Sequence, residues 1–207
     1  MKSSLPQNPF TRGLESIVRA ICIACGWWLI GISVLTCVEM LGRKVFGFSL
    51  QGVDEVGSYT FAVVTAFGFS YALITRGHTR VDFLISRFAP RQRALINWLA
   101  MVTLAAMAAF FAYRAYFVLA ESIDLKSTAP TPLATPLWIP QSVWFVAYAI
   151  FALTALTAAL HACVLAVRGA WVELNASYGP QTLEEEIESE AAIRVEPRRT
   201  EGAKASE

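Results

Sequence analysis

The stretch Ile17–Val38, IVRAICIACGWWLIGISVLTCV, decides the fold class of this chain. Its 22 residues, which include one charge, Arg19, span about 33 Å as an α-helix. That length is enough to cross a bilayer core of about 30 Å. The run is also too long for the apolar part of an ordinary signal peptide, about 7–15 residues, and no small-x-small cleavage site follows it. We therefore expect a retained transmembrane helix.

Three further apolar runs have the same character. Backbone groups inside lipid must be hydrogen-bonded within their own segment, so each run is predicted to be an α-helix. The composition agrees, because 56% of the 207 residues are hydrophobic and only 16% are charged, too few to cover a soluble domain. The predicted fold class is all-α integral membrane. The four transmembrane helices are expected at about 17–38, 56–74, 95–120 and 143–167.

Basic residues are distributed unevenly around these spans. The N-terminal part carries Lys2, Arg12 and Arg19, and the connection between the second and third spans carries five arginines against one acid, Asp82. Acids balance or outnumber the basic residues in the other two connections. Because basic loops stay on the cytoplasmic side, we expect both termini and the arginine-rich connection to be cytoplasmic. No basic patch with interleaved aromatic residues indicates nucleic-acid binding.

Two segments have the pattern of short amphipathic helices lying on the cytoplasmic membrane surface. In residues 79–89, Thr79 and Asp82 have the spacing of a capping box, and apolar residues recur on one face until Pro90. Before the first span, Asn8-Pro9 provides a cap and a first-turn proline.

The chain divides by composition into three parts. Residues 1–16 form a cytoplasmic N-terminal segment, and residues 17–171 form the four-helix membrane domain. Residues 172–207 are rich in glutamate and poor in apolar residues, so they are expected to be a disordered cytoplasmic tail.

The few polar groups inside the spans are expected to be structural. Arg114 lies about six residues, or roughly 9 Å, from the outer end of its predicted helix. Snorkelling or a structural ion pair accounts for it, with a partner contact or a transport role as alternatives. His161 lies similarly close to the inner end of its helix and is interpreted as a satisfied or snorkelling ring. Cys22 and Cys25 form a lone Cys-x-x-Cys pair, interpreted as small buried hydrophobic residues rather than a redox or zinc site.

The connection before the second span concentrates charge. Arg43 and Lys44 precede the acidic pair Asp54-Glu55, which opens the span, where carboxylates favour the positive end of the helix. A local ion pair is compatible with this arrangement, and no ligand is needed to explain it. The sequence contains neither a mid-membrane carboxylate relay nor the broken helices of many substrate sites, and no catalytic motif. The chain is therefore not expected to be an enzyme.

The helices do carry packing surfaces. Small residues at every fourth position let helix backbones approach closely, and internal packing and docking to a partner fit this pattern equally well. These residues are Ser58, Ala62, Ala66 and Ser70 in the second span and Ala158, Ala162 and Ala166 in the fourth. Trp27 and Trp28 fall near mid-span and are expected to pack on another helix. We interpret the chain as a subunit of an assembly.

With these features the chain resembles the small membrane subunit, the DctQ-type component, of tripartite ATP-independent periplasmic (TRAP) transporters. The resemblance runs from about Leu14 to Trp171 and depends on the order and spacing of short motifs around four helices. These motifs are Arg43, Phe46, Ser49 and Gly52 before Asp54-Glu55, then Arg76-Gly77-His78, Val81-Asp82, Pro90, Arg91-Gln92-Arg93 and Thr135-Pro136-Leu137-Trp138-Ile139-Pro140.

The resemblance implies a location in the bacterial inner membrane and two partners. A large multi-span subunit (M type) would hold the sodium and substrate sites, and a periplasmic binding protein would deliver an organic acid or related small anion. This chain would brace the large subunit, bind no cofactor of its own, and meet the binding protein through residues 39–55 and 121–142. The candidate partner-interface or structural residues are Arg43, Asp54, Glu55, His78, Asp82, Arg114, Trp138 and Pro140.

Two other function classes remain open at this point. A membrane anchor of a haem or quinone electron-transfer complex would use His78 and His161, the only two histidines, which are predicted to lie on the same side. An autonomous small carrier would depend on an intramembrane charge, for which Arg114 is the candidate.

Overall fold

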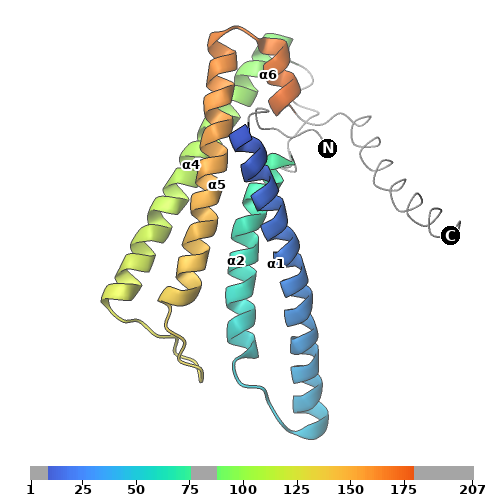
Figure 1. The fold of residues 1–207 in the computed structure, drawn as a ribbon, viewed down its shortest axis with the longest axis vertical. Helices are drawn as coiled ribbons and strands as arrows, with labels where there is room; N and C mark the ends of the chain where they lie inside the picture. Colours follow the sequence, from blue (N-terminus) through green and yellow to red (C-terminus); the bar gives the residue numbers. More distant parts are fainter. Residues whose placement is uncertain (1–8, 76–87, 180–207) are drawn as a thin grey trace, which may run out of the picture.

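The computed structural model describes residues 9–75 and 88–179, and this part of the chain is helical (Figure 1). Four of its helices are long and apolar enough to cross a membrane, which confirms the predicted number. These are α1 (Pro9–Leu41), α2 (Val53–Ile74), α4 (Pro90–Asp124) and α5 (Trp138–Val167). The π-helical turn η1 (Gly42–Phe46) continues α1, and the short helix α6 (Trp171–Tyr178) follows α5. The described residues contain no strand, only one isolated bridge between Thr128 and Pro136.

Each long helix extends beyond the apolar run from which it was predicted. Helix α4 starts at Pro90, where a first-turn proline needs no hydrogen-bond donor. The backbone N–H of Ala89 donates to Gln92 Oε1 at 3.1 Å and so closes this end of the helix. Helix α2 starts at Val53, directly after Gly52, which places the acidic pair in its first turn as expected.

The helices pack as two antiparallel pairs, α1 with α2 and α4 with α5, joined by contacts between α2 and α5. The pairs meet near α6 and diverge toward the other end (Figure 1). We call these the α6 end and the connection end, the latter holding residues 42–52 and 125–137. The main apolar core lies at the α6 end, where Val18, Leu73 and Met101 from three helices are buried together. The two ends therefore differ, with a packed core at one and open helix faces toward the other.

The small-residue pattern serves internal packing along part of its length. Ala66 and Ser70 of α2 are buried, and so are Ala158 and Ala162 of α5. On α2, however, Ser58 and Ala62 are exposed near the connection end. Close packing within the chain therefore explains Ala66 and Ser70, the part of the α2 small-residue pattern nearer α6, but not Ser58 and Ala62.

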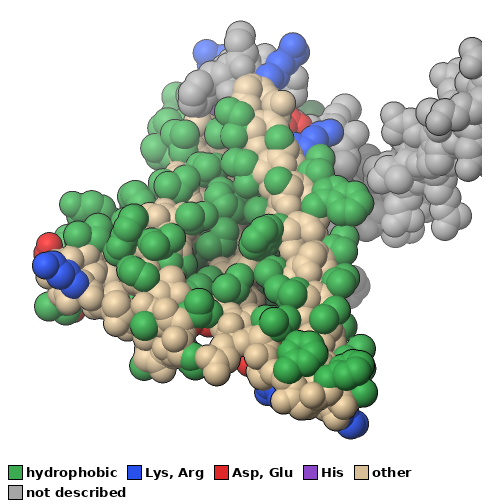
Figure 2. All heavy atoms as spheres, turned by 60° about the horizontal axis from the view of Figure 1, so that its bottom comes forward, with side chains coloured by type: hydrophobic (Ala, Val, Ile, Leu, Met, Phe, Trp, Pro, Cys, Tyr) green, Lys and Arg blue, Asp and Glu red, His purple; other side chains and the backbone are tan. Residues whose placement is uncertain are grey.

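The outer surface matches a protein surrounded by lipid. Figure 2 shows hydrophobic side chains over the flanks of the helices, with lysines, arginines and acids gathered mainly at the ends. The most apolar 18-residue window of α1 contains no buried residue. Helix α1 thus packs along one edge of the bundle and leaves most of its surface to lipid or to a partner.

The sequence predicted that the tail begins at residue 172, whereas residues Trp171–Tyr178 form helix α6. Leu174 and Tyr178 are fully buried in the main core. The Asn175 amide donates to the carbonyl of Pro90 at 2.8 Å and accepts from Asn97 Nδ2 at 3.0 Å. These contacts join α6 to the start of α4, so the folded part continues past residue 171.

Candidate functional site

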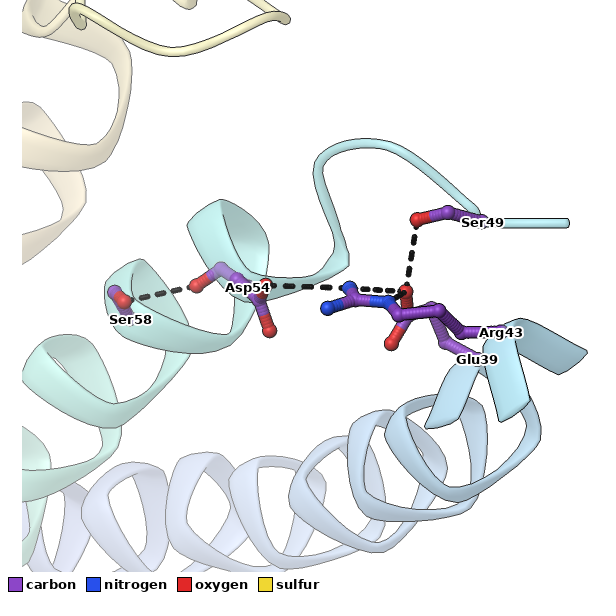
Figure 3. A network of polar contacts seen from close by, with 5 residues as sticks. All are labelled: Glu39, Arg43, Ser49, Asp54 and Ser58. Carbon is purple, nitrogen blue, oxygen red and sulfur yellow. Dashed lines mark hydrogen bonds and ion pairs between the residues drawn. The ribbon is translucent and has the colours of Figure 1, made fainter. Parts of the chain in front are cut away.

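The connection between α1 and α2 is held by a polar network centred on Glu39 (Figure 3). Glu39 is only 2% exposed, and its Oε1 accepts hydrogen bonds from Arg43 Nε and Ser49 Oγ, each at 2.9 Å. Arg43 Nη2 contacts the same oxygen and lies 3.9 Å from Asp54 Oδ2. The expected local ion pair is therefore present, and it links the end of α1 to the first turn of α2.

The backbone around this network explains its geometry. Gly47, at a φ of 69°, reverses the chain after η1 and allows Ser49 to return toward Glu39. The Phe48 ring lies on Gly42, where a β-carbon would come within 2.7 Å of the ring. Two glycines thus permit a tight, folded-back connection instead of an open loop.

Glu55 joins the two connections at this end of the molecule. Its side chain is buried, its Oε1 accepts a hydrogen bond from Tyr59 Oη at 2.9 Å, and its Oε2 accepts one from Thr131 Oγ1. Tyr59 lies one turn along α2, whereas Thr131 lies in the α4–α5 connection. The carboxylate therefore fastens that distant connection to the start of α2.

Gly52 makes a second contact between the same two segments. Its φ is 95°, in the left-handed region that favours glycine. A β-carbon here would lie 1.5 Å from Leu133 Cδ1, so the Leu133 side chain occupies the place that any other residue would need. Glycine is favoured at this position for two reasons: its backbone is left-handed, and Leu133 packs where a side chain would lie.

The α4–α5 connection is itself ordered by backbone hydrogen bonds. The N–H of Ala129 donates to the carbonyl of Thr135, and that of Leu137 to Ser127, each at 3.0 Å. Trp138 then begins α5, and Pro140 lies in its first turn, where its missing N–H costs no intrahelical bond. A cavity of about 470 Å³ opens beside this turn, lined by Ile123, Lys126, Ser127, Thr128, Pro136 and Trp138.

Together the two connections form one fixed surface, which we call the connection platform (residues 42–55 and 125–140). The carboxylate of Glu55 within it, and that of Glu39 at the end of α1, are engaged by contacts within the chain. Across residues 9–75 and 88–179, no group of three His, Cys, Asp or Glu side chains could hold a metal ion. The arrangement is suited to presenting a shaped surface to another protein.

Among the described residues Arg114 forms no ion pair of the kind considered for it, and its snorkelling stays a prediction. It is exposed on α4, ten residues or about 15 Å before the helix ends at Asp124. Within the described part of the chain it forms no salt bridge, so the structural ion pair considered for it is not formed there. Its guanidinium therefore faces whatever surrounds the helix.

The two mid-span tryptophans of α1 also differ from each other. Trp28 Nε1 donates to Thr60 Oγ1 of α2 at 2.9 Å, so this ring contacts another helix as predicted. Trp27 is 71% exposed. Within this chain Trp27 projects from the edge of the bundle, so its packing on another helix stays a prediction.

The remaining polar groups of the spans are structural. His161 Nδ1 lies 2.8 Å from Tyr178 Oη, which gives the satisfied ring expected for it. Cys22 and Cys25 are free and half-buried rather than fully buried, and Cys22 Sγ contacts the carbonyl of Phe67 at 3.8 Å.

Some predicted site residues lie outside the described part of the chain, and some observed contacts of α6 were not predicted. His78, Asp82 and the interfacial helix expected at 79–89 lie outside the described residues, apart from its last two positions. The roles of Asn175 and Tyr178 were missed, although Trp171, Leu174 and Tyr178 have the spacing of one helix face.

The fold and the platform define the class of the molecule, a multi-pass membrane protein with four apolar helices and a fixed surface at one end. A family model described as "Tripartite ATP-independent periplasmic transporters, DctQ component" matches residues 32–165. The match covers more than half of the chain, including α2, α4, all but the last two residues of α5, and both parts of the connection platform. The chain therefore belongs to the DctQ family, the small permease subunits of TRAP transporters. Searches among curated proteins and among solved structures gave no significant match.

Proposed function

We propose that this chain is the non-catalytic small permease subunit of a sodium-driven importer of organic acids or related small anions. A periplasmic binding protein delivers the substrate, and a large membrane subunit holds the sodium and substrate sites. The small subunit braces that large subunit in the membrane. Membership of the DctQ family supports the tripartite assembly. The chain's own residues support the bracing role.

The exposure of α1 is the observation that carries the bracing role. Tryptophan favours the membrane–water interface over the hydrocarbon centre, yet Trp27 projects outward near the middle of an apolar span. Ile30 and Val34 are exposed on the same helix. In a bilayer, helices associate through close van der Waals packing and interhelical hydrogen bonds, and an outward indole ring offers both. We assign this face of α1 to a helix of the large subunit.

The connection platform supports a second contact, with the binding protein. Arg43 and Asp54 are exposed in the α1–α2 connection, and Lys126 and Trp138 line a cavity at the α4–α5 connection. Charged residues around a partly apolar hollow are typical of a transient protein interface. The contacts of Glu39, Gly52 and Glu55 fix the surface before the partner arrives, which lowers the ordering cost of docking.

The proposal includes an orientation. The arginines of the segment between α2 and α4 and of the N-terminal part favour the cytoplasm for the α6 end. The connection platform then faces the periplasm, where the binding protein is. The competing assignment as a haem or quinone anchor has no support from the family match, and His161 is engaged by Tyr178.

Co-purification tests this function. The full chain, tagged at its C-terminus, is extracted from native membranes in mild detergent and its companions are identified by mass spectrometry. The proposal expects a stoichiometric large membrane protein, joined by a periplasmic binding protein when substrate is present. Isolation of the chain alone, or with a haem- or flavin-bearing enzyme, would overturn it.

A further inference from the structure

A groove between α1 and α2 lies outside the connection platform. It has a volume of about 570 Å³. Its walls come from one face of each helix, and they are mainly apolar. The lining residues are Arg19, Cys22, Ile23, Cys25, Gly26, Val64, Gly68 and Tyr71.

Two contacts fix how the walls of this groove face each other. Trp28 hydrogen-bonds to Thr60, and Cys22 contacts the carbonyl of Phe67. In this antiparallel register, Arg19 lies level with the Tyr71 end of α2, while Gly26 lies level with the Val64 end. From Arg19 to Gly26 the groove runs seven residues, or about 10 Å along α1. Its cation and its phenol are therefore both at the α6 end.

Two glycines of the lining face open space. A β-carbon added at Gly26 or at Gly68 would meet nothing within 4 Å. The hollow is therefore wide enough to admit atoms from outside the chain. Apart from Arg19, the lining contains no ionisable group other than the two thiols and the phenol.

Arg19 has donors to spare at the mouth of this groove. Its Nη2 lies 3.5 Å from Glu15 Oε1, a long and exposed contact one turn away. An arginine guanidinium carries five N–H donors arranged to hold phosphate or carboxylate oxygens in pairs. Tyr71 is partly exposed beside it and adds a hydroxyl. This end of the groove is thus complementary to an anion.

We propose that the α1–α2 groove binds an anionic phospholipid of the leaflet in which the α6 end lies. The phosphate contacts Arg19 and Tyr71, and an acyl chain lies along Cys22, Gly26 and Gly68. Charge complementarity selects this occupant, since a lipid supplies an anion at the membrane surface and a hydrocarbon chain below it. Basic sites between transmembrane helices bind anionic headgroups in this way. A neutral apolar helix would offer no oxygen to the guanidinium donors of Arg19 that Glu15 does not engage.

Native mass spectrometry of the full chain tests the site. The chain is released from nanodiscs of phosphatidylglycerol and phosphatidylethanolamine in equal amounts. Arg19→Ala should lower the fraction of chain carrying phosphatidylglycerol about fivefold, the effect of one basic residue at a charged membrane surface. Gly68→Leu should fill the hollow and remove the retained lipid of either kind. Arg168→Ala and Gly31→Leu, a cation and an open helical glycine outside the groove, serve as matched controls and should retain it.

Photolabelling keeps the proposal testable if a variant does not fold. A phosphatidylglycerol with a photoactivatable acyl chain should label wild-type peptides containing residues 22–26 and 64–71, in the chain alone and in its complex with the large subunit. Equal lipid retention by Arg19→Ala, Gly68→Leu and the controls would overturn the proposal. So would loss of this labelling in the complex, because a helix of the large subunit would then fill the groove. Co-purification of the large subunit is a separate readout, so the lipid site and the proposed function can each fail without the other.

Discussion

The hydroxyl of Thr131 donates a hydrogen bond to the Glu55 carboxylate, across 76 residues of chain. This contact joins the α4–α5 connection to the first turn of α2. Tyr59 holds the other carboxylate oxygen at 2.9 Å, so both oxygens of Glu55 are engaged. The two connections consequently act as one surface.

Replacing Glu55 should loosen that surface without disturbing the membrane helices. In Glu55→Ala the α4–α5 connection loses its tie, so protease cleavage within residues 125–137 should become severalfold faster, and the binding protein should dock more weakly. Asp54→Ala is the matched control for the cleavage rate only, since Asp54 is adjacent but largely exposed and makes only a 3.9 Å ion contact. Equal cleavage rates in the two variants would mean that Glu55 does not hold the connection.

Gly52 should tolerate no side chain. Gly52→Ala adds left-handed strain of about 1–3 kcal/mol and a clash with Leu133, so the chain should unfold at a lower temperature in detergent. Gly31→Ala, in open space within α1, should be neutral or slightly stabilising. The double variant Gly52→Ala with Leu133→Ala should recover only part of the loss, because the backbone strain remains. Full recovery would show that φ at Gly52 is unimportant.

Trp27 should matter for assembly more than for the fold of this chain. Trp27→Ala removes a ring that is 71% exposed, so thermal unfolding of the isolated chain should change little. Retention of the large subunit should fall about tenfold or more, as is usual for a buried aromatic anchor of an interface. Phe110→Ala, an exposed aromatic residue on α4, is the control. If both variants retain the large subunit as well as wild type does, the α1 face is not the interface.

Helix α6 should contribute to stability through two buried side chains. Leu174→Ala removes a fully buried side chain, so the free energy of unfolding should drop by about 2–5 kcal/mol. Val172→Ala, two residues earlier and almost fully exposed, should change it by less than about 0.5 kcal/mol. Denaturant titration followed by helical circular dichroism measures both. If Leu174→Ala lowered the free energy of unfolding as little as Val172→Ala, α6 would lie outside the folded core.

The four long helices could be predicted because hydropathy and length determine membrane spans almost locally. The proximity of Arg43 to Asp54 could also be predicted, since one short connection separates the two residues. Charge placement in the first turn of α2 followed from the helix dipole alone. These features need no knowledge of how the helices pack.

Contacts between distant segments could not be predicted in the same way. Nothing local to Glu55 indicates Thr131, because their contact depends on how two helix pairs are placed side by side. The core role of α6 was hidden by the acidic sequence that follows, although Leu174 and Tyr178 share one helix face. The direction in which Trp27 points could not be predicted, because hydropathy does not distinguish an inward from an outward tryptophan.

Uptake into proteoliposomes tests the central claim most directly. Liposomes carrying this chain, the large subunit that co-purifies with it, or both are given an inward sodium gradient, the binding protein and labelled organic acids. The account predicts sodium-dependent uptake only when both membrane subunits and the binding protein are present, and none with this chain alone. Robust uptake by liposomes that contain only this chain would contradict the account.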